Sequence, residues 1–151
     1  MPNLIPISQI QFAALTQPLI GQTVSRAWRG IGTSLFLEIG PLTGIYKKSE
    51  NKKGKWGIAF DYCWRVEGKR SVLFGSSSGD RKINRGISTL VHNFIQEISL
   101  VGSLPELNIQ LSEGKWIHSF TASENQPEWA VHLDDVRWIE TKQGRLFLGS
   151  E

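Results

Sequence analysis

Four stretches of the chain alternate between large apolar side chains and small or polar ones. They are residues 35–39, 56–61, 107–111 and 129–133. Because successive side chains of a strand point to opposite faces, this pattern predicts strands with one buried face and one wet face. Such strands are typical of antiparallel sheets. After residue 133 the apolar parity shifts, which predicts a turn or bulge at Asp134–Asp135.

Two segments carry helix signals instead. Ser8 and Gln11 have the spacing of a capping box, so we expect a helix that begins after Ser8 and is bounded by Pro18. A second helix is expected to begin with Asp80 as its N-cap. Its apolar stripe would consist of Ile83, Ile87, Leu90, Val91 and Phe94.

Glycine-rich and polar segments predict the connections between these elements. Gly30 and Gly32 lie where a hairpin would reverse, and residues 112–114 offer another reversal. Residues 41–55 contain five lysines, two glycines and few apolar anchors. We expect this lysine-rich segment to form a long, mobile loop.

The order of residues in the first half recurs in the second half. The segment from Trp56 to Ser76 returns 73 positions later, from Trp129 onward, and the strand at residues 35–39 returns 72 positions later. An internal repeat explains this recurrence, with one copy over about 1–78 and the other over about 79–151. The predicted fold class is α+β, with two pseudo-symmetric repeats of a helix plus an antiparallel meander that share one core in a single domain, residues 1–151.

The composition indicates the cellular compartment. Six tryptophans, seven phenylalanines and two tyrosines can build a shared core without disulfides. Cys63 is the single cysteine, which fits a reducing compartment. The N-terminal residues lack the pattern of a signal peptide, and no apolar run reaches the ~20 residues of a membrane span. We therefore expect a cytoplasmic protein that does not contact a membrane.

The two halves differ in charge. Residues 1–88 hold 13 basic and 5 acidic residues, a net of +8, and residues 89–151 hold 4 and 9, a net of −5. Three interpretations remain open: a solvated surface without a specific partner, steering toward a partner protein, and nucleic-acid contact through the lysine-rich segment. No helix-turn-helix, zinc-finger or RRM pattern accompanies those lysines.

Several residues are candidates for catalysis or metal binding. His118, His132 and Asp134 are a possible metal set, and Asp61 and Asp134 follow matching strands as acid–base partners would. The spacing of the three matches no ligand pattern, and turn-capping explains both aspartates. Cys63 lacks a neighbouring base, and residues 75–79 fail the Walker pattern. We therefore assign no catalytic, cofactor-binding or metal-binding residue, expect no cofactor, and leave any chemical role of Asp61, Asp134 and His132 open.

Some large aromatic and basic residues suggest a contact surface instead. The parity of Trp28, Trp64 and Trp138 does not clearly bury them, and Trp64–Arg65 aligns with Arg137–Trp138 in the repeat. Tryptophan and arginine are enriched at the energetic centres of interfaces. The candidate interaction residues are Trp28, Arg29, Lys47, Lys48, Lys52, Lys53, Lys55, Trp64, Arg65, Arg137 and Trp138.

The chain resembles a family of small uncharacterised bacterial proteins with an internal α+β repeat. The likeness lies in residues 29–40, Cys63–Glu67, Gly75–Ser76 and the strand at Trp129. The lysine-rich segment is longer and more basic than the family pattern. In size and composition this family is similar to immunity and accessory proteins of bacterial defence systems, although immunity proteins against nucleases are often acidic and this chain has a net charge of +3.

These observations favour a non-enzymatic protein-binding module. The resemblance implies that this module acts as an immunity or defence-system accessory protein. The alternative is a nucleic-acid-associated protein that binds through the lysine-rich segment. A partner protein is expected, a homo-oligomer is compatible with the pattern, and the sequence names neither the partner nor the arrangement of the sheets.

Overall fold

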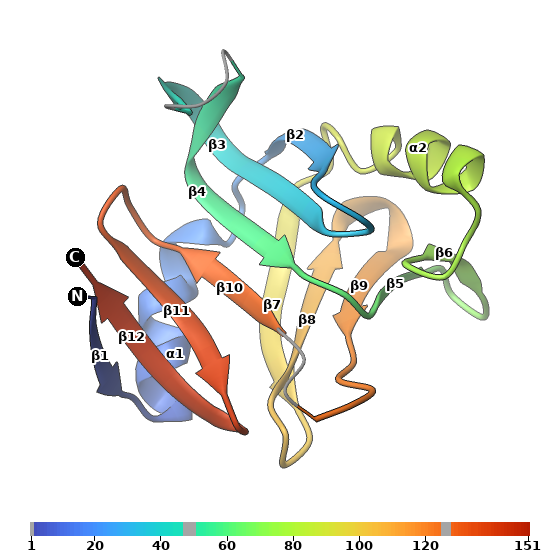
Figure 1. Ribbon diagram of the computed structural model, residues 1–151. Helices are drawn as coiled ribbons and strands as arrows, with labels where there is room; N and C mark the ends of the chain where they lie inside the picture. Colours follow the sequence, from blue (N-terminus) through green and yellow to red (C-terminus); the bar gives the residue numbers. More distant parts are fainter. Residues whose placement is uncertain (1, 47–50, 125–127) are drawn as a thin grey trace.

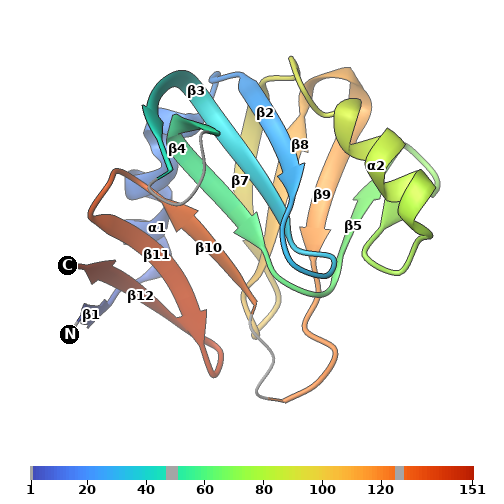
Figure 2. The same cartoon turned by 45° about the horizontal axis from the view of Figure 1, so that its top comes forward.

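The computed structural model describes residues 2–46, 51–124 and 128–151, which fold into two antiparallel sheets and two short α-helices (Figure 1). The expected α+β class with antiparallel strands is confirmed at this level. The sheets lie in two layers, and the two ends of the chain lie side by side because the first strand pairs with the last (Figures 1 and 2).

The first layer is a seven-stranded sheet with the order β1-β12-β11-β10-β4-β3-β2. Its strands come from both halves of the chain. In chain order they are β1 (Asn3–Pro6), β2 (Val24–Arg29), β3 (Leu35–Ile45), β4 (Lys52–Phe60), β10 (Trp129–His132), β11 (Arg137–Lys142) and β12 (Arg145–Ser150).

The second layer is a five-stranded sheet with the order β6-β5-β9-β8-β7. It also mixes the two halves, because β5 and β6 precede the second helix whereas the other strands follow it. The strands are β5 (Trp64–Glu67), β6 (Val72–Gly75), β7 (Ile95–Val101), β8 (Glu106–Leu111) and β9 (Lys115–Ser119).

The first helix, α1 (Gln9–Thr16), begins as predicted. Ser8 accepts a hydrogen bond from the Gln11 amide at 3.1 Å, and the Gln11 side chain accepts one from the Ser8 amide at 2.8 Å, so the capping box is confirmed. A 3-10 turn, η1 (Gln17–Leu19), contains Pro18 and ends the helical segment.

The second helix, α2 (Asp80–Ser88), is shorter than predicted. Its N-cap is Gly79, and Asp80 is the first helical residue, where its carboxylate favours the helix dipole. Leu90 is buried in the turn beyond the helix, and Phe94 is 45% exposed. The apolar stripe therefore extends past the helix because a buried turn continues its periodicity.

The inner faces of the two sheets share one core. The predicted strand positions Leu35, Leu37 and Ile39 lie in this core, as do Leu107, Ile109 and Leu111 from the other sheet. The helices close its two ends: α1 contacts β7, and α2 contacts β2 and β6. Gly30 and Gly32 reverse the chain between β2 and β3, and a second 3-10 turn, η2 (Ser112–Gly114), reverses it between β8 and β9, as predicted.

The two sheets meet along β2 and β7 through a reciprocal set of backbone hydrogen bonds. Val24 donates to Asn93 at 2.7 Å, and Ile95 donates to Gln22 at 2.9 Å. His92 donates to Val24 at 2.8 Å, and Gly21 donates to Ile95 at 2.7 Å. Each bond has a counterpart that is shifted by 71 positions, and both Gly21 and His92 have positive φ. A bridge between Thr23 and Phe94 lies at the centre of this arrangement.

The predicted internal repeat, which aligns Trp56 with Trp129, is not confirmed. Trp129 lies on β10, which is the hydrogen-bonded neighbour of β4, where Trp56 lies. Trp64 lies on β5, which pairs with β9 in the other sheet. Trp64 donates to the Thr33 carbonyl at 2.6 Å, and Trp129 donates to the Pro105 carbonyl at 2.9 Å.

The strand pairing shows how the two halves of the chain are linked. In each half, a helix and three strands are followed by a hairpin that joins the sheet of the other half: β5–β6 extends β9, and β10–β11 extends β4. The β3–β4 hairpin is much longer than the β8–β9 hairpin. A constant offset along the sequence therefore does not follow the positions in space.

The lysine-rich segment is not a free loop over most of its length. Its described residues form the distal parts of β3 and β4, which pair with each other as far as Ile45 and Lys52. Few apolar side chains are needed there, because backbone hydrogen bonds between two long strands hold the arm together. Lys47 and Lys48 lie outside the described residues.

Candidate functional site

The seven-stranded sheet has an inner face, which packs on the core, and an outer face. Among the described residues neither helix crosses the outer face (Figure 2). One row of cross-strand neighbours runs over it with aromatic side chains toward both ends and alanines in the middle. The row is Trp28, Phe36, Ala59, Ala130, Glu140 and Phe147.

A second row runs parallel to the first. In this row Gly57 lies between Glu38 and His132, and Trp138 lies beside Gly149. The row is Arg26, Glu38, Gly57, His132, Trp138 and Gly149. A Cβ at Gly149 would lie 2.3 Å from the Trp138 ring, so glycine is what allows the indole to lie flat on the strand.

An aromatic cluster occupies the β2–β3 side of the outer face. The rings of Trp28 and Phe36 stack with centroids 4.3 Å apart, and Tyr46 meets Trp28 edge-on at 5.7 Å. The guanidinium of Arg26 lies 5.4 Å from the Trp28 ring centroid. Such stacked and edge-on pairs add to the free energy of burial.

Glu38 lies buried beneath this cluster, with 1% of its surface exposed. Its carboxylate accepts hydrogen bonds from Trp28 Nε1 at 2.7 Å, from the Tyr46 hydroxyl at 2.7 Å and from the Gly54 amide at 3.1 Å. Burial raises the pKa of Tyr46 well above its usual 10, and the hydrogen bond and charge of Glu38 raise it further. The acid therefore holds both aromatic side chains and the β4 backbone in one arrangement.

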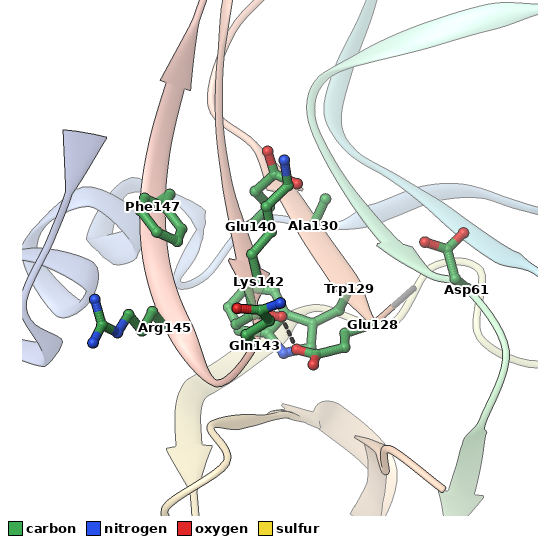
Figure 3. Close-up of a pocket in the computed structure, with 10 residues that line it drawn as sticks. Asp61, Glu128, Trp129, Ala130, Glu140, Lys142, Gln143, Arg145 and Phe147 are labelled. Atoms are coloured by element: carbon green, nitrogen blue, oxygen red, sulfur yellow. Dashed lines mark hydrogen bonds between the residues drawn. The ribbon is translucent and has the colours of Figure 1, made fainter. Parts of the chain in front are cut away.

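A hollow of about 920 Å³ opens on the β10–β12 side of the same face (Figure 3). We call it the outer-face hollow. Its charged side chains are three carboxylates and two cations, and Phe147 supplies an aromatic wall. The lining is Asp61, Glu128, Trp129, Ala130, Glu140, Thr141, Lys142, Gln143, Arg145 and Phe147.

The carboxylates of the hollow differ in their surroundings. Glu128 accepts a hydrogen bond from the Thr141 hydroxyl, and Glu140 accepts one from Trp138 Nε1 at 3.2 Å. Desolvation raises the pKa of Asp61 above its usual 3.8. Figure 3 shows the Asp61 side chain apart from the others, at the end of β4. The arrangement offers hydrogen-bond acceptors, a hydroxyl group and charges of both signs to a ligand.

The candidate catalytic and metal-binding residues do not form one cluster. Asp61 and Asp134 lie at opposite ends of the β4–β10 pair, so strand geometry separates them by roughly 20 Å. His118 lies on β9 in the other sheet, with its Nε2 3.5 Å from Glu67. The buried residues of β9 are its neighbours Ile117 and Ser119, so His118 lies on the opposite face of the strand.

His132 and Asp134 do share a small hollow of about 70 Å³ beside Glu38 and Lys53. Desolvation lowers the pKa of His132, and the charge of Lys53 lowers it further. Across residues 2–46, 51–124 and 128–151, no group of three His, Cys, Asp or Glu side chains is placed to hold a metal ion.

Comparison with known proteins found no similar protein: no protein-family model, curated protein or solved structure matches the chain. In the part of the chain that the structure describes, no helix has the length and apolar character needed to cross a bilayer.

The three candidate tryptophans differ in exposure. Trp28 and Trp138 are half-buried on the outer face, where their indoles donate to Glu38 and Glu140. Trp64 has no exposed surface, so the prediction that it lies at a contact surface is wrong. Its side chain faces inward and packs edge-on against Phe74 at 5.9 Å. Strand parity alone did not reveal this, because both sides of β5 carry large side chains.

The candidate arginines form local ion pairs. Arg29 contacts Asp80 at 2.9 Å and so ties β2 to α2. Arg65 contacts Glu67 at 2.6 Å, with its guanidinium 5.6 Å from the Phe120 ring centroid, and Arg137 contacts Asp134 at 2.8 Å. These three arginines are spread over three parts of the surface and do not form one site.

The candidate lysines that the structure describes, Lys52, Lys53 and Lys55, lie along β4. Lys53 contacts Asp135 at 3.4 Å and lies 5.6 Å from the Tyr46 ring centroid, and Lys55 lies 4.8 Å from that of Trp56. Lys52 is exposed. Lys53 and Lys55 therefore pack on aromatic rings of their own hairpin.

Sequence reasoning did not single out Glu38, Phe36 and Phe147 as candidate site residues. The alternation at residues 35–39 placed Phe36 and Glu38 on the wet face. A large aromatic side chain and a carboxylate together on the wet face of one strand are the signal that could have drawn attention to them. It was not sufficient, because Glu38 is buried by residues that come from β2 and from the far end of β3.

The turn between β10 and β11 gives a pH-dependent prediction. Partial burial raises the pKa of Asp134, but hydrogen bonds from Arg137 and Val136 outweigh it and hold the pKa below its usual 3.8. The stabilisation by the charged form is therefore complete above about pH 4 and is lost as the pH falls through the folded-state pKa. Asp134→Asn keeps the amide contacts but removes the charge.

Urea denaturation of the wild type and Asp134→Asn should be compared from neutral pH down to about pH 3. We expect the wild type to be the more stable protein at neutral pH and the difference to shrink on acidification. Parallel stability curves over this range would contradict the assigned role of the charge.

Proposed function

We propose that this protein is a non-enzymatic module that binds a partner protein through the outer face of its seven-stranded sheet. The observation that carries the proposal is the composition of that face. Aromatic side chains on β2–β3 and on β11–β12 flank a strip of small residues, and no described helix crosses it. Aromatic side chains that are held rigid by hydrogen bonds are suited to protein contacts, since little side-chain entropy is lost on binding.

The charges of this face support selective contact. The outer-face hollow has an acidic majority, whereas the β3–β4 arm toward the other end of β4 carries Lys52, Lys53 and Lys55. A partner with complementary charges would be oriented as it approaches. An immunity or defence-system accessory role is the form of this proposal that the family resemblance favours.

Nucleic-acid binding through the lysines is the weaker candidate. Lys53 and Lys55 lie over their own hairpin's aromatic rings, and Asp134 and Asp135 lie beside them. Those carboxylates oppose the approach of phosphates.

We also infer that the two halves of the chain are copies of one ancestral unit. Val24 and Ile95 carry matching bulges before Arg26 and Glu97, and the buried Leu19 and Leu90 are 71 positions apart. On this inference Trp64 is the counterpart of Trp129. Exchange of the β5–β6 and β10–β11 hairpins between copies would link both halves into one domain.

The binding proposal is tested by capture from lysates of the source cells with three versions of the purified protein. They are the wild type, Phe147→Glu on the outer face and Gln96→Glu at an exposed position of β7. We expect a partner that the wild type and Gln96→Glu retain and that Phe147→Glu loses, because a charge on the aromatic wall would be desolvated at the interface.

A partner retained equally by all three proteins would contradict the assignment to this face. Turnover of a substrate by the isolated protein would contradict the non-enzymatic role. A neighbouring toxin gene would support the immunity form, and its product should then be the captured partner.

A further inference from the structure

A second surface lies on the far side of the molecule, between α2 and β6. It is a hollow of about 620 Å³ whose floor is formed by Leu73, Phe74 and Gly86. A Cβ at Gly86 would lie 2.6 Å from the Phe74 ring, so the missing side chain lets the ring pack down onto the helix. We call this hollow the α2–β6 groove.

The rim of the α2–β6 groove is basic. Arg81, Lys82, Arg85 and Lys115 line it, and no acidic residue is part of the lining. Lys115 lies 3.8 Å from Glu113, whereas Arg81, Lys82 and Arg85 have no ion-pair partner among the described residues. Arg81, Lys82 and Arg85 are exposed. The groove therefore combines an apolar floor with uncompensated positive charge.

The β6 strand forms one side of the groove and is the last strand of its sheet. Among the described strands it pairs with β5 alone. Val72 and Leu73 are 58% and 38% exposed. An edge of this kind presents unpaired backbone groups, to which an extended chain can add as a further strand.

The other half of the molecule shows such an addition. β11 pairs with β10 as β6 pairs with β5, with Ile139 opposite Val131 as Phe74 is opposite Val66. The outer edge of β11 is covered by β12, and Leu146 of β12 is buried in the core, with the partly buried Leu148 packed against it. The place beside β6 that corresponds to β12 is taken by no described strand.

We propose that the α2–β6 groove binds an extended acidic segment of a partner protein, which adds to β6 as β12 adds to β11. Alternate apolar side chains of that segment would enter the groove over Phe74, and its carboxylates would meet Arg81, Lys82 and Arg85. This site is separate from the outer face and does not depend on the function proposed above.

A second copy of this chain is a poor occupant of the groove. Two β6 edges paired in a dimer would bring two sets of the same cations together, and like charges at an interface are costly. An acidic partner segment removes this repulsion and satisfies the β6 backbone at the same time.

The probe is a short fluorescein-labelled peptide of alternating glutamate and leucine, tested against the full-length protein by fluorescence anisotropy. A peptide of alternating lysine and leucine is its matched control. The test variant is Arg81→Glu/Arg85→Glu, and the control variant is Lys142→Glu/Arg145→Glu, which changes the net charge equally in the outer-face hollow. Hydrogen exchange of the β6 amides is measured in the wild type with and without peptide.

We expect the acidic peptide to bind, the basic one not to bind, and the Arg81→Glu/Arg85→Glu affinity to fall at least about tenfold while the control variant changes much less. The β6 amides should become protected. Equal loss in both variants would show unspecific charge attraction, and binding without β6 protection would exclude strand addition. Either result would overturn the proposal, as would displacement of the peptide by phosphatidylserine vesicles.

Discussion

Replacing Trp64 by alanine is expected to lower the free energy of unfolding by about 3–5 kcal/mol. The side chain has no exposed surface, contacts the ring of Phe74 and donates to the Thr33 carbonyl at 2.6 Å. The substitution leaves a large cavity where β5 meets the core, and the Thr33 carbonyl loses its donor. Urea denaturation followed by circular dichroism measures the change.

Two further variants make this result specific. Tyr62→Ala removes a nearby aromatic side chain that is 49% exposed, and its cost should stay within about 0.5 kcal/mol. Trp129→Ala removes the tryptophan that occupies the matching place beside β4, and we expect its cost to be similar to that of Trp64→Ala. A Trp64→Ala protein as stable as Tyr62→Ala would contradict the burial of Trp64.

Replacing Glu38 by alanine is expected to cost about 3 kcal/mol or more, because each buried donor that loses its acceptor costs roughly 1–3 kcal/mol. The Trp28 indole, the Tyr46 hydroxyl and the Gly54 amide would all lose the same acceptor. The effect should reach the outer face as well, since these bonds fix the aromatic cluster. Urea denaturation gives the cost.

Glu38→Gln separates the acceptor from its charge. The glutamine oxygen can accept the bonds from Trp28 and Tyr46, whereas its amino group would face the Gly54 amide, so this variant should retain part of the stability that Glu38→Ala loses. Glu97→Ala on β7 is the surface control, because Glu97 is exposed. If Glu38→Ala cost no more than Glu97→Ala, the carboxylate would not be the group that holds the cluster together.

The local elements were largely predictable from the sequence. The capping box at Ser8 and Gln11, the strands at residues 35–39 and 107–111, and the reversals at Gly30–Gly32 and 112–114 all form where expected. These features depend on neighbours within a few positions in the chain, so their physical causes are present in the local sequence. The end of α2 was misplaced because a buried turn continues the apolar period of a helix.

The candidate site was predictable only in part. Trp28 and Trp138 were recognised as residues that the core does not fully bury, and both lie on the outer face. The acceptors that hold them, Glu38 and Glu140, are close in sequence but were not recognised. The α2–β6 groove was not foreseen, because its floor and rim come from β6, α2 and β9, which pattern alone does not bring together.

What the sequence determined by itself is the alternation of faces, the caps and the turns, because side-chain period and local hydrogen bonding fix them. Tertiary structure alone decided which strands became neighbours. The period of a strand states which side chains share a face but not which strand lies beside it. For this reason Trp64 is in the core, Glu38 is buried on a face that reads as wet, and β6 ends its sheet beside a basic helix.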